Sequence, residues 1–124
     1  MNNAAQQKPK TALILGAAGF VGSYLADHLN ESGKWSVCVT KMPHEALSIQ
    51  NVTEFDLDIL QPAQIVALLC AVQPDVIFHL AAQSSVALSW KNPTLTVDVN
   101  IKGTLNLLDA VRAAKLSPRI LLIG

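Results

Sequence analysis

Short apolar runs alternate with longer amphipathic stretches along this chain, and the two patterns predict different elements. An apolar run without regular polar positions predicts a strand that is buried on both faces of a sheet. The runs of this kind are Thr11–Leu15, Trp35–Thr40, Val52–Asp56, Val76–Leu80 and Ile120–Ile123. Because helical stretches separate them, they predict parallel strands that are joined by right-handed crossovers.

The amphipathic stretches predict three helices, which run from Gly19 to about Ser32, from Pro62 to the break at Pro74, and from Asn92 to about Ala114. In the third helix, Leu105, Leu108 and Val111 are expected to line one apolar face. Asn100 and Gly103 are poor residues for a helix interior, so they predict a kink or an asparagine that bonds to the main chain.

Three glycines at intervals of three residues follow the first predicted strand. Gly16 can turn sharply off the strand at positive φ, Gly19 lets the backbone approach a bulky anion, and Gly22 lets the helix pack closely. The N–H groups and the positive dipole end of the following helix then face a pyrophosphate. The context of strand, glycine turn and helix predicts a nucleotide-binding site.

These patterns together predict an α/β fold, a Rossmann-type doubly wound parallel sheet with strand order 3-2-1-4-5. The ligand crevice is expected at the carboxyl ends of the first and fourth strands, where the order reverses. Residues 1–10 are polar and are expected to be a disordered tail, and residues 11–124 a nucleotide-binding domain.

Composition removes several functional classes. Apolar residues make up 51% and charged residues 15%, which excludes a disordered chain. Nine basic residues balance nine acidic ones, so no basic surface for nucleic acid or anionic lipid is expected. The apolar runs are too short to cross a bilayer, and with no leader-like segment we expect a cytoplasmic protein. Cys38 and Cys70 are expected to be reduced and buried, and their spacing predicts no metal site.

The end of the second strand departs from the usual NAD pattern, in which an acidic residue there binds the ribose 2′-hydroxyl. This chain has Thr40 and Lys41 at that point, and no carboxylate appears before Glu45. A cation suits a 2′-phosphate and so favours NADP over NAD, with His44 as a weaker candidate neighbour. The alternative interpretation is that Lys41 is a solvated loop lysine.

Further polar residues follow the third and fourth strands. Asp56 is the candidate for an adenine amino group, while Asp58 suits a local role before the next helix. His79 is interpreted as a satisfied core histidine rather than a catalytic base. Ser84 and Ser85 can donate to a substrate phosphate or hydroxyl, or can end a strand.

Four segments resemble the extended short-chain dehydrogenase/reductase family of sugar-nucleotide epimerases, dehydratases and reductases. They are GAAGFVG at Gly16–Gly22, FDLD at Phe55–Asp58, HLAAQSSV at His79–Val86 and VNIKGTLNLLDA at Val99–Ala110. Within the family, the run HLAAQSSVALSWKNP is most similar to dehydratases and reductases of GDP-mannose metabolism.

The resemblance implies a role for each matching position. The residues implied at the pyrophosphate are Gly16, Gly19, Phe20 and Val21, while Lys41 is implied near the adenosine ribose, and Asp56 and Leu57 at the adenine. The residues implied along the route toward the nicotinamide are Leu80, Ala81, Ala82 and Gln83. Asn100 matches the family's helix asparagine, which supports the active site, and Ser84 is implied on the sugar-nucleotide side. The implied substrate is a GDP-linked 4-keto-6-deoxy sugar or GDP-mannose.

The family's catalytic Ser/Thr and its Tyr-x-x-x-Lys pair have no counterpart in this sequence. The only tyrosine, Tyr24, lies in the first predicted helix, and the family's serine would come next after Gly124. The resemblance therefore implies that residues 11–124 are an incomplete NAD(P)-binding domain, with a sheet truncated after the fifth strand. We expect the 124-residue chain to bind a cofactor without turning over a substrate.

Two other interpretations stay open: a non-catalytic dinucleotide sensor, and a half that pairs with a separately encoded C-terminal half. We also expect apolar surface on the last strand and the long helix, and with it a homodimer or another self-association through that helix.

Overall fold

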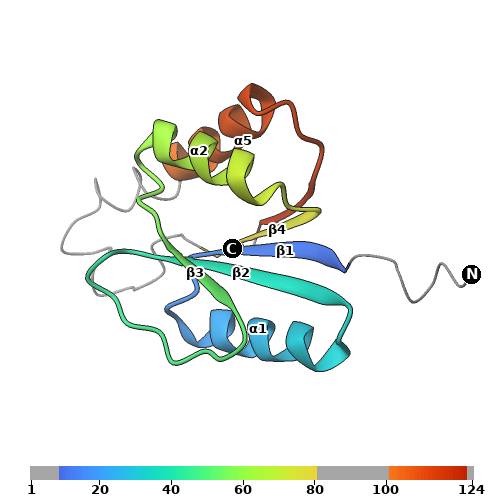
Figure 1. Cartoon of the computed structure of the whole chain (residues 1–124). Coiled ribbons are helices and arrows are strands. Elements are labelled where there is room, and N and C mark those ends of the chain that lie inside the picture. The colour runs from blue at the N-terminus through green and yellow to red at the C-terminus, as the bar shows by residue number, and fades with distance from the viewer. Residues whose placement is uncertain (1–8, 81–100, 123–124) are drawn as a thin grey trace, which may run out of the picture.

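The computed structural model describes residues 9–80 and 101–122, which form three layers. A parallel sheet lies between α1 (Phe20–Ser32) on one face and α2 (Pro62–Val72) with α5 (Gly103–Ala113) on the other (Figure 1). The strands are β1 (Lys10–Leu15), β2 (Trp35–Lys41), β3 (Thr53–Asp56), β4 (Val76–His79) and β5 (Arg119–Leu122).

The strand order β3-β2-β1-β4-β5 confirms the predicted doubly wound topology. All neighbouring pairs are parallel, and the register aligns their carboxyl ends: Leu15 pairs with His79, His79 with Leu122, and Lys41 with Asp56. The order reverses between β1 and β4, so the ends of these strands and of β2 and β3 border the predicted crevice.

The central strands are buried on both faces, and successive side chains enter opposite layers. Leu13 and Leu15 pack in the cluster under α2 and α5, whereas Ala12 and Ile14 pack in the cluster over α1. The expectation of burial on both faces fails for the edge strands β3 and β5, whose residues are mostly exposed.

The predicted apolar face of the third helix is wrong for two of its three residues. Leu105 and Leu108 are 55% and 40% exposed, whereas Leu107 is fully buried. The reason lies at Gly103, where an added Cβ would lie 3.0 Å from Ile59 Cγ2, so α5 approaches its neighbour along the glycine side. The part of the predicted helix before residue 101 lies outside the described residues.

Apolar surface on α5 and β5 was expected, and it is present. The large apolar residues that are exposed on these two elements and two residues before α5 are Ile101, Leu105, Leu108, Leu121 and Leu122. Residues 101–102, immediately before α5, have π-helical backbone. Asn100 lies outside the described residues, so the choice between a kink and an asparagine that bonds to the main chain stays a prediction.

The two cysteines differ in environment. Cys38 on β2 is buried as predicted, and burial raises the pKa of its thiol. Cys70 is exposed, which corrects the expectation that both are buried; α2 buries Ile65, Leu68 and Leu69, and Cys70 lies on the side away from them. Both thiols are free.

The described ranges contain no helix long and apolar enough to cross a membrane. Within the same ranges, no group of three or more His, Cys, Asp or Glu side chains could hold a metal ion.

A pair of leucines on α5 tests which face of the helix is buried. Leu107→Ala should lower the free energy of unfolding by about 2–5 kcal/mol because it leaves a cavity in the core. Leu105→Ala should change it by less than about 1 kcal/mol because that side chain is half in solvent. Urea unfolding followed by circular dichroism measures both, and equal losses would contradict the described face.

Candidate functional site

The glycine turn between β1 and α1 is the first part of the site. Gly16 has φ 82°, in the left-handed region that the turn requires, which confirms the role predicted for it. Gly19 is the N-cap residue of α1, and the first turn of this helix carries no acidic side chain. The N–H groups of Phe20 and Val21 begin the helix, where intrahelical acceptors are absent. The turn therefore presents an uncompensated positive helix end to an anion.

Thr40, at the end of β2, holds this turn in place. The Gly16 N–H donates to Thr40 Oγ1 at 3.0 Å, and the Ala17 N–H donates to the Thr40 carbonyl at 2.8 Å. Thr40 is only 2% exposed, so both bonds are shielded from water. Sequence reasoning missed this residue, although a hydroxyl at the last buried position of an apolar strand is a signal for such a bond.

Gly22 and Gly19 have different structural reasons to lack a side chain. A Cβ on Gly22 would lie 2.6 Å from the Ala17 Cα and carbonyl oxygen, so α1 contacts the turn too closely for any other residue. A Cβ on Gly19 would meet no atom within 4 Å. Gly22 is thus needed for packing, whereas the space at Gly19 fits the predicted approach of a pyrophosphate.

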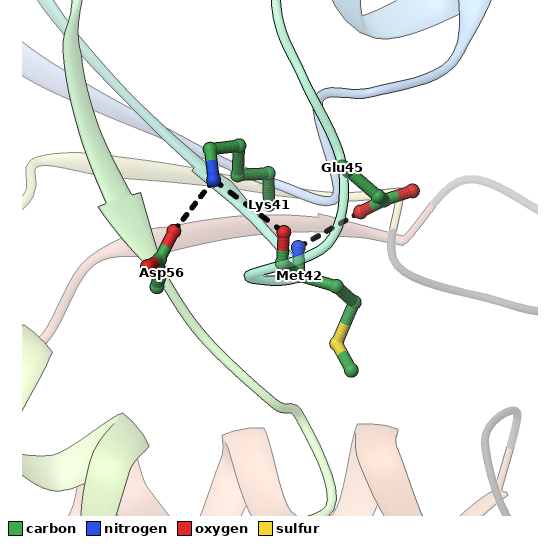
Figure 2. A network of polar contacts seen from close by, with 4 residues as sticks. All are labelled: Lys41, Met42, Glu45 and Asp56. Carbon is green, nitrogen blue, oxygen red and sulfur yellow. Dashed lines mark hydrogen bonds and ion pairs between the residues drawn. The ribbon is translucent and has the colours of Figure 1, made fainter.

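Lys41 and Asp56, two residues predicted separately for the adenosine end, form an ion pair. Lys41 Nζ lies 2.7 Å from Asp56 Oδ1 and 3.5 Å from the Met42 carbonyl oxygen (Figure 2). The Lys41 side chain is 16% exposed and that of Asp56 57% exposed. The Lys41 side chain is therefore largely covered, and its charge is already matched by a carboxylate that faces solvent.

A second carboxylate reaches the end of β2 through a short turn. Glu45 Oε1 accepts from the Met42 N–H at 2.8 Å, and the Glu45 N–H donates to the Met42 carbonyl at 3.0 Å. Figure 2 shows Glu45 and Asp56 on opposite sides of this strand end. The sequence places Glu45 four residues beyond Lys41, and the Pro43–His44 dipeptide between them was the signal for a turn that brings it back.

Asp58, which follows β3, has the local role that was predicted for it. Asp58 Oδ1 accepts from the Leu60 N–H at 3.0 Å, which is a local turn bond before α2. Leu57 is less available to an adenine than predicted, because its side chain is buried and its N–H donates to the Lys41 carbonyl at 2.8 Å. A ligand cannot use that N–H without breaking the bond to β2.

His79, at the end of β4, is 3% exposed, so its placement in the core is confirmed. Its Nε2 lies 3.1 Å from Thr104 Oγ1 on α5, whereas Nδ1 is buried without a hydrogen-bond partner among the described residues. It is therefore satisfied at one nitrogen rather than two. Burial lowers the pKa of His79, which keeps the ring neutral near pH 7.

The remaining predicted residues lie either at the carboxyl end of β4 or outside the residues that the structure describes. The Leu80 N–H donates to the Leu15 carbonyl at 2.9 Å, which continues the pairing of β4 with β1 beyond His79. The predicted residues that lie outside the described ranges are Ala81, Ala82, Gln83, Ser84, Ser85 and Asn100.

Comparison with known proteins gives matches over most of the chain. The family model described as GDP-mannose 4,6 dehydratase matches residues 13–123. A GDP-mannose 4,6-dehydratase of Sordaria araneosa is 38% identical over 120 residues, covering 92% of this chain and 22% of that protein. A UDP-glucose 4-epimerase of Mycoplasma pneumoniae is 35% identical over 105 residues, covering 81% and 31%.

Among solved structures, UDP-glucose 4-epimerase from Brucella ovis in complex with NAD has a TM-score of 0.82 and 28% identity. The match covers 91% of this chain and 35% of that one. The chain thus spans about a third or less of the length of the proteins it matches.

The two glycines offer a matched pair of substitutions. Gly22→Ala should destabilise the fold by about 1–3 kcal/mol, because its Cβ collides with the backbone of Ala17. Gly19→Ala should leave the free energy of unfolding nearly unchanged but weaken binding of a dinucleotide, because its Cβ enters the space before α1. Urea unfolding and calorimetric titration separate these effects; a stability loss in Gly19→Ala as large as in Gly22→Ala would contradict them.

Burial of His79 predicts a pH dependence of stability. Its folded-state pKa is lowered, so below about pH 6.5 the unfolded chain takes up a proton that the folded chain resists. The free energy of unfolding should fall as the pH drops from 7.5 to 5.5, with a slope of at most about 1.4 kcal/mol per pH unit from this group. His79→Gln should remove that part of the slope in urea titrations, while His28 and His44 are present in both proteins. Identical slopes would overturn the assignment.

Proposed function

The chain belongs to the GDP-mannose 4,6 dehydratase family of extended short-chain dehydrogenases/reductases, and we propose that it forms the dinucleotide-binding part of a nucleotide-sugar enzyme. The observation that carries the proposal is the glycine turn at the end of β1. Its positive φ at Gly16, the open space at Gly19 and the close packing at Gly22 fit the three demands of a pyrophosphate clamp.

The residues present fit a nicotinamide dinucleotide. The N–H groups of Phe20 and Val21 would hold the pyrophosphate, and Asp56 with the backbone at Leu57 would border the adenine. Leu80 would border the path toward the nicotinamide at the reversal of strand order. When bound, the dinucleotide supplies a hydride acceptor or donor. The task of these residues is to fix its position relative to a sugar.

The proposed substrate is a nucleotide sugar, either a GDP-linked 4-keto-6-deoxy sugar or GDP-mannose. The match to a GDP-mannose 4,6 dehydratase model supports the GDP-linked class, and UDP-glucose 4-epimerases among the relatives support the wider nucleotide-sugar class. Because the chain covers at most about a third of the relatives reported above, the reaction of the whole protein is part of the proposal. A cytoplasmic location stays a prediction.

NADP is proposed as the cofactor in preference to NAD. The support is Lys41, which places an ammonium group at the end of β2, where a 2′-phosphate would lie. The structural relative from Brucella ovis was solved with NAD, so NAD is the alternative. Self-association is also proposed, and it is supported by the exposed Leu105 and Leu108 on α5.

Titration with NADPH and NADH tests both the site and the preference. Lys41→Ala should weaken NADPH binding about tenfold, the loss expected for one charge-assisted hydrogen bond at a partly exposed site. It should leave NADH binding within about twofold, since NADH has no 2′-phosphate. Lys34→Ala, which removes the same charge just before the start of β2, serves as the control.

The outcomes separate the two claims. Equal weakening of NADPH and NADH by Lys41→Ala would refute the 2′-phosphate role while leaving the dinucleotide site in place. Failure of the folded wild-type chain to bind either cofactor would refute the dinucleotide site itself.

A further inference from the structure

We propose that Asp56 is a specificity-determining residue that competes with the 2′-phosphate of the cofactor for the Lys41 ammonium group. This inference rests on the proposed function, because it concerns the adenosine end of the same site. The Lys41–Asp56 ion pair then limits the preference for NADP that Lys41 would otherwise give.

The fold fixes the two charges opposite each other. Lys41 is the last residue of β2 and Asp56 the last residue of β3, and the two are direct partners in the parallel register. The Leu57 N–H donates to the Lys41 carbonyl at 2.8 Å, which holds the strand ends together one residue beyond the pair. The carboxylate is therefore built into the position where it can reach Nζ, and the distance of 2.7 Å shows that it does so.

The ammonium group has little freedom to leave its partner. The Lys41 side chain is 16% exposed, and its Nζ also lies 3.5 Å from the Met42 carbonyl oxygen. That carbonyl is itself fixed by the Glu45 N–H in the turn that follows β2. Figure 2 shows the ammonium between Asp56 and the Met42 carbonyl, so both acceptors lie within reach of one anchored cation.

The charges around this strand end sum to one negative unit, because Lys41 is accompanied by the carboxylates of Asp56 and Glu45. A cofactor without a 2′-phosphate leaves the ion pair intact. A 2′-phosphate that approaches Lys41 must either displace Asp56 from the ammonium group or share that group with it. The same lysine thus attracts the phosphate only to the extent that Asp56 releases it.

The test uses ADP-ribose and its 2′-phosphate as probes, because they carry the adenosine and pyrophosphate groups without the nicotinamide. The measured quantity is the ratio of the two dissociation constants by calorimetry, in which contacts common to both probes cancel. Asp56→Asn keeps the shape and an acceptor oxygen but removes the charge. We expect it to shift the ratio toward the 2′-phosphate probe by about fivefold, the upper range for a partly exposed ion pair.

Two further variants show whether Asp56 acts through Lys41. Glu54→Gln removes the same charge two residues earlier on β3, and Glu54 forms no ion pair with a described residue. This variant should keep the ratio within about twofold of the wild-type ratio. In a Lys41→Ala background, Asp56→Asn should also leave the ratio unchanged, because the ammonium group for which Asp56 and the phosphate compete is gone.

Each outcome decides. If Asp56→Asn does not change the ratio of dissociation constants, the proposed competition is wrong. If it changes the ratio equally in the Lys41→Ala background, the competition is also wrong, because Asp56 would then repel the phosphate directly. Failure of both probes to bind the folded wild-type chain would instead refute the dinucleotide site, and this inference with it.

Discussion

Two hydrogen bonds to one buried threonine fix the turn on which the rest of the site depends. Thr40 accepts from the Gly16 N–H with its hydroxyl and from the Ala17 N–H with its carbonyl. No side chain of α1 caps its own first turn, so the position of the helix end follows from the pairing of β1 with β2. Loss of the hydroxyl would leave a shielded N–H without an acceptor, which costs more than the bond contributes.

The sequence was sufficient for the parallel sheet, its strand order and the distinct roles of Gly16 and Gly22, because buried runs and left-handed turns are local signals. It was insufficient for the face of α5, since leucines at 105, 107 and 108 occupy both sides of that helix. The contact of Gly103 with Ile59 makes the choice, and this contact joins residues far apart in the chain. Lys41 and Asp56 were each identified, but their pairing depends on a cross-strand register that no local pattern contains.

The site divides its proposed task between two kinds of group. At the glycine turn, backbone N–H groups and the end of a helix would face the pyrophosphate, and their geometry depends on glycines rather than on charged residues. At the ends of β2 and β3, charged side chains supply the contacts, and a single substitution can change their balance. The pyrophosphate, which all such cofactors share, would therefore contact the backbone, and the ribose 2′ position, at which they differ, would contact the side chains.

The site draws on the ends of β1, β2 and β3, so it exists only when three strands from separate parts of the chain have paired. The unfolded chain has no equivalent of it. A bound cofactor would therefore stabilise the native state by mass action, with a gain that grows with its concentration relative to the dissociation constant. The folded fraction of this chain would then rise with the concentration of cofactor.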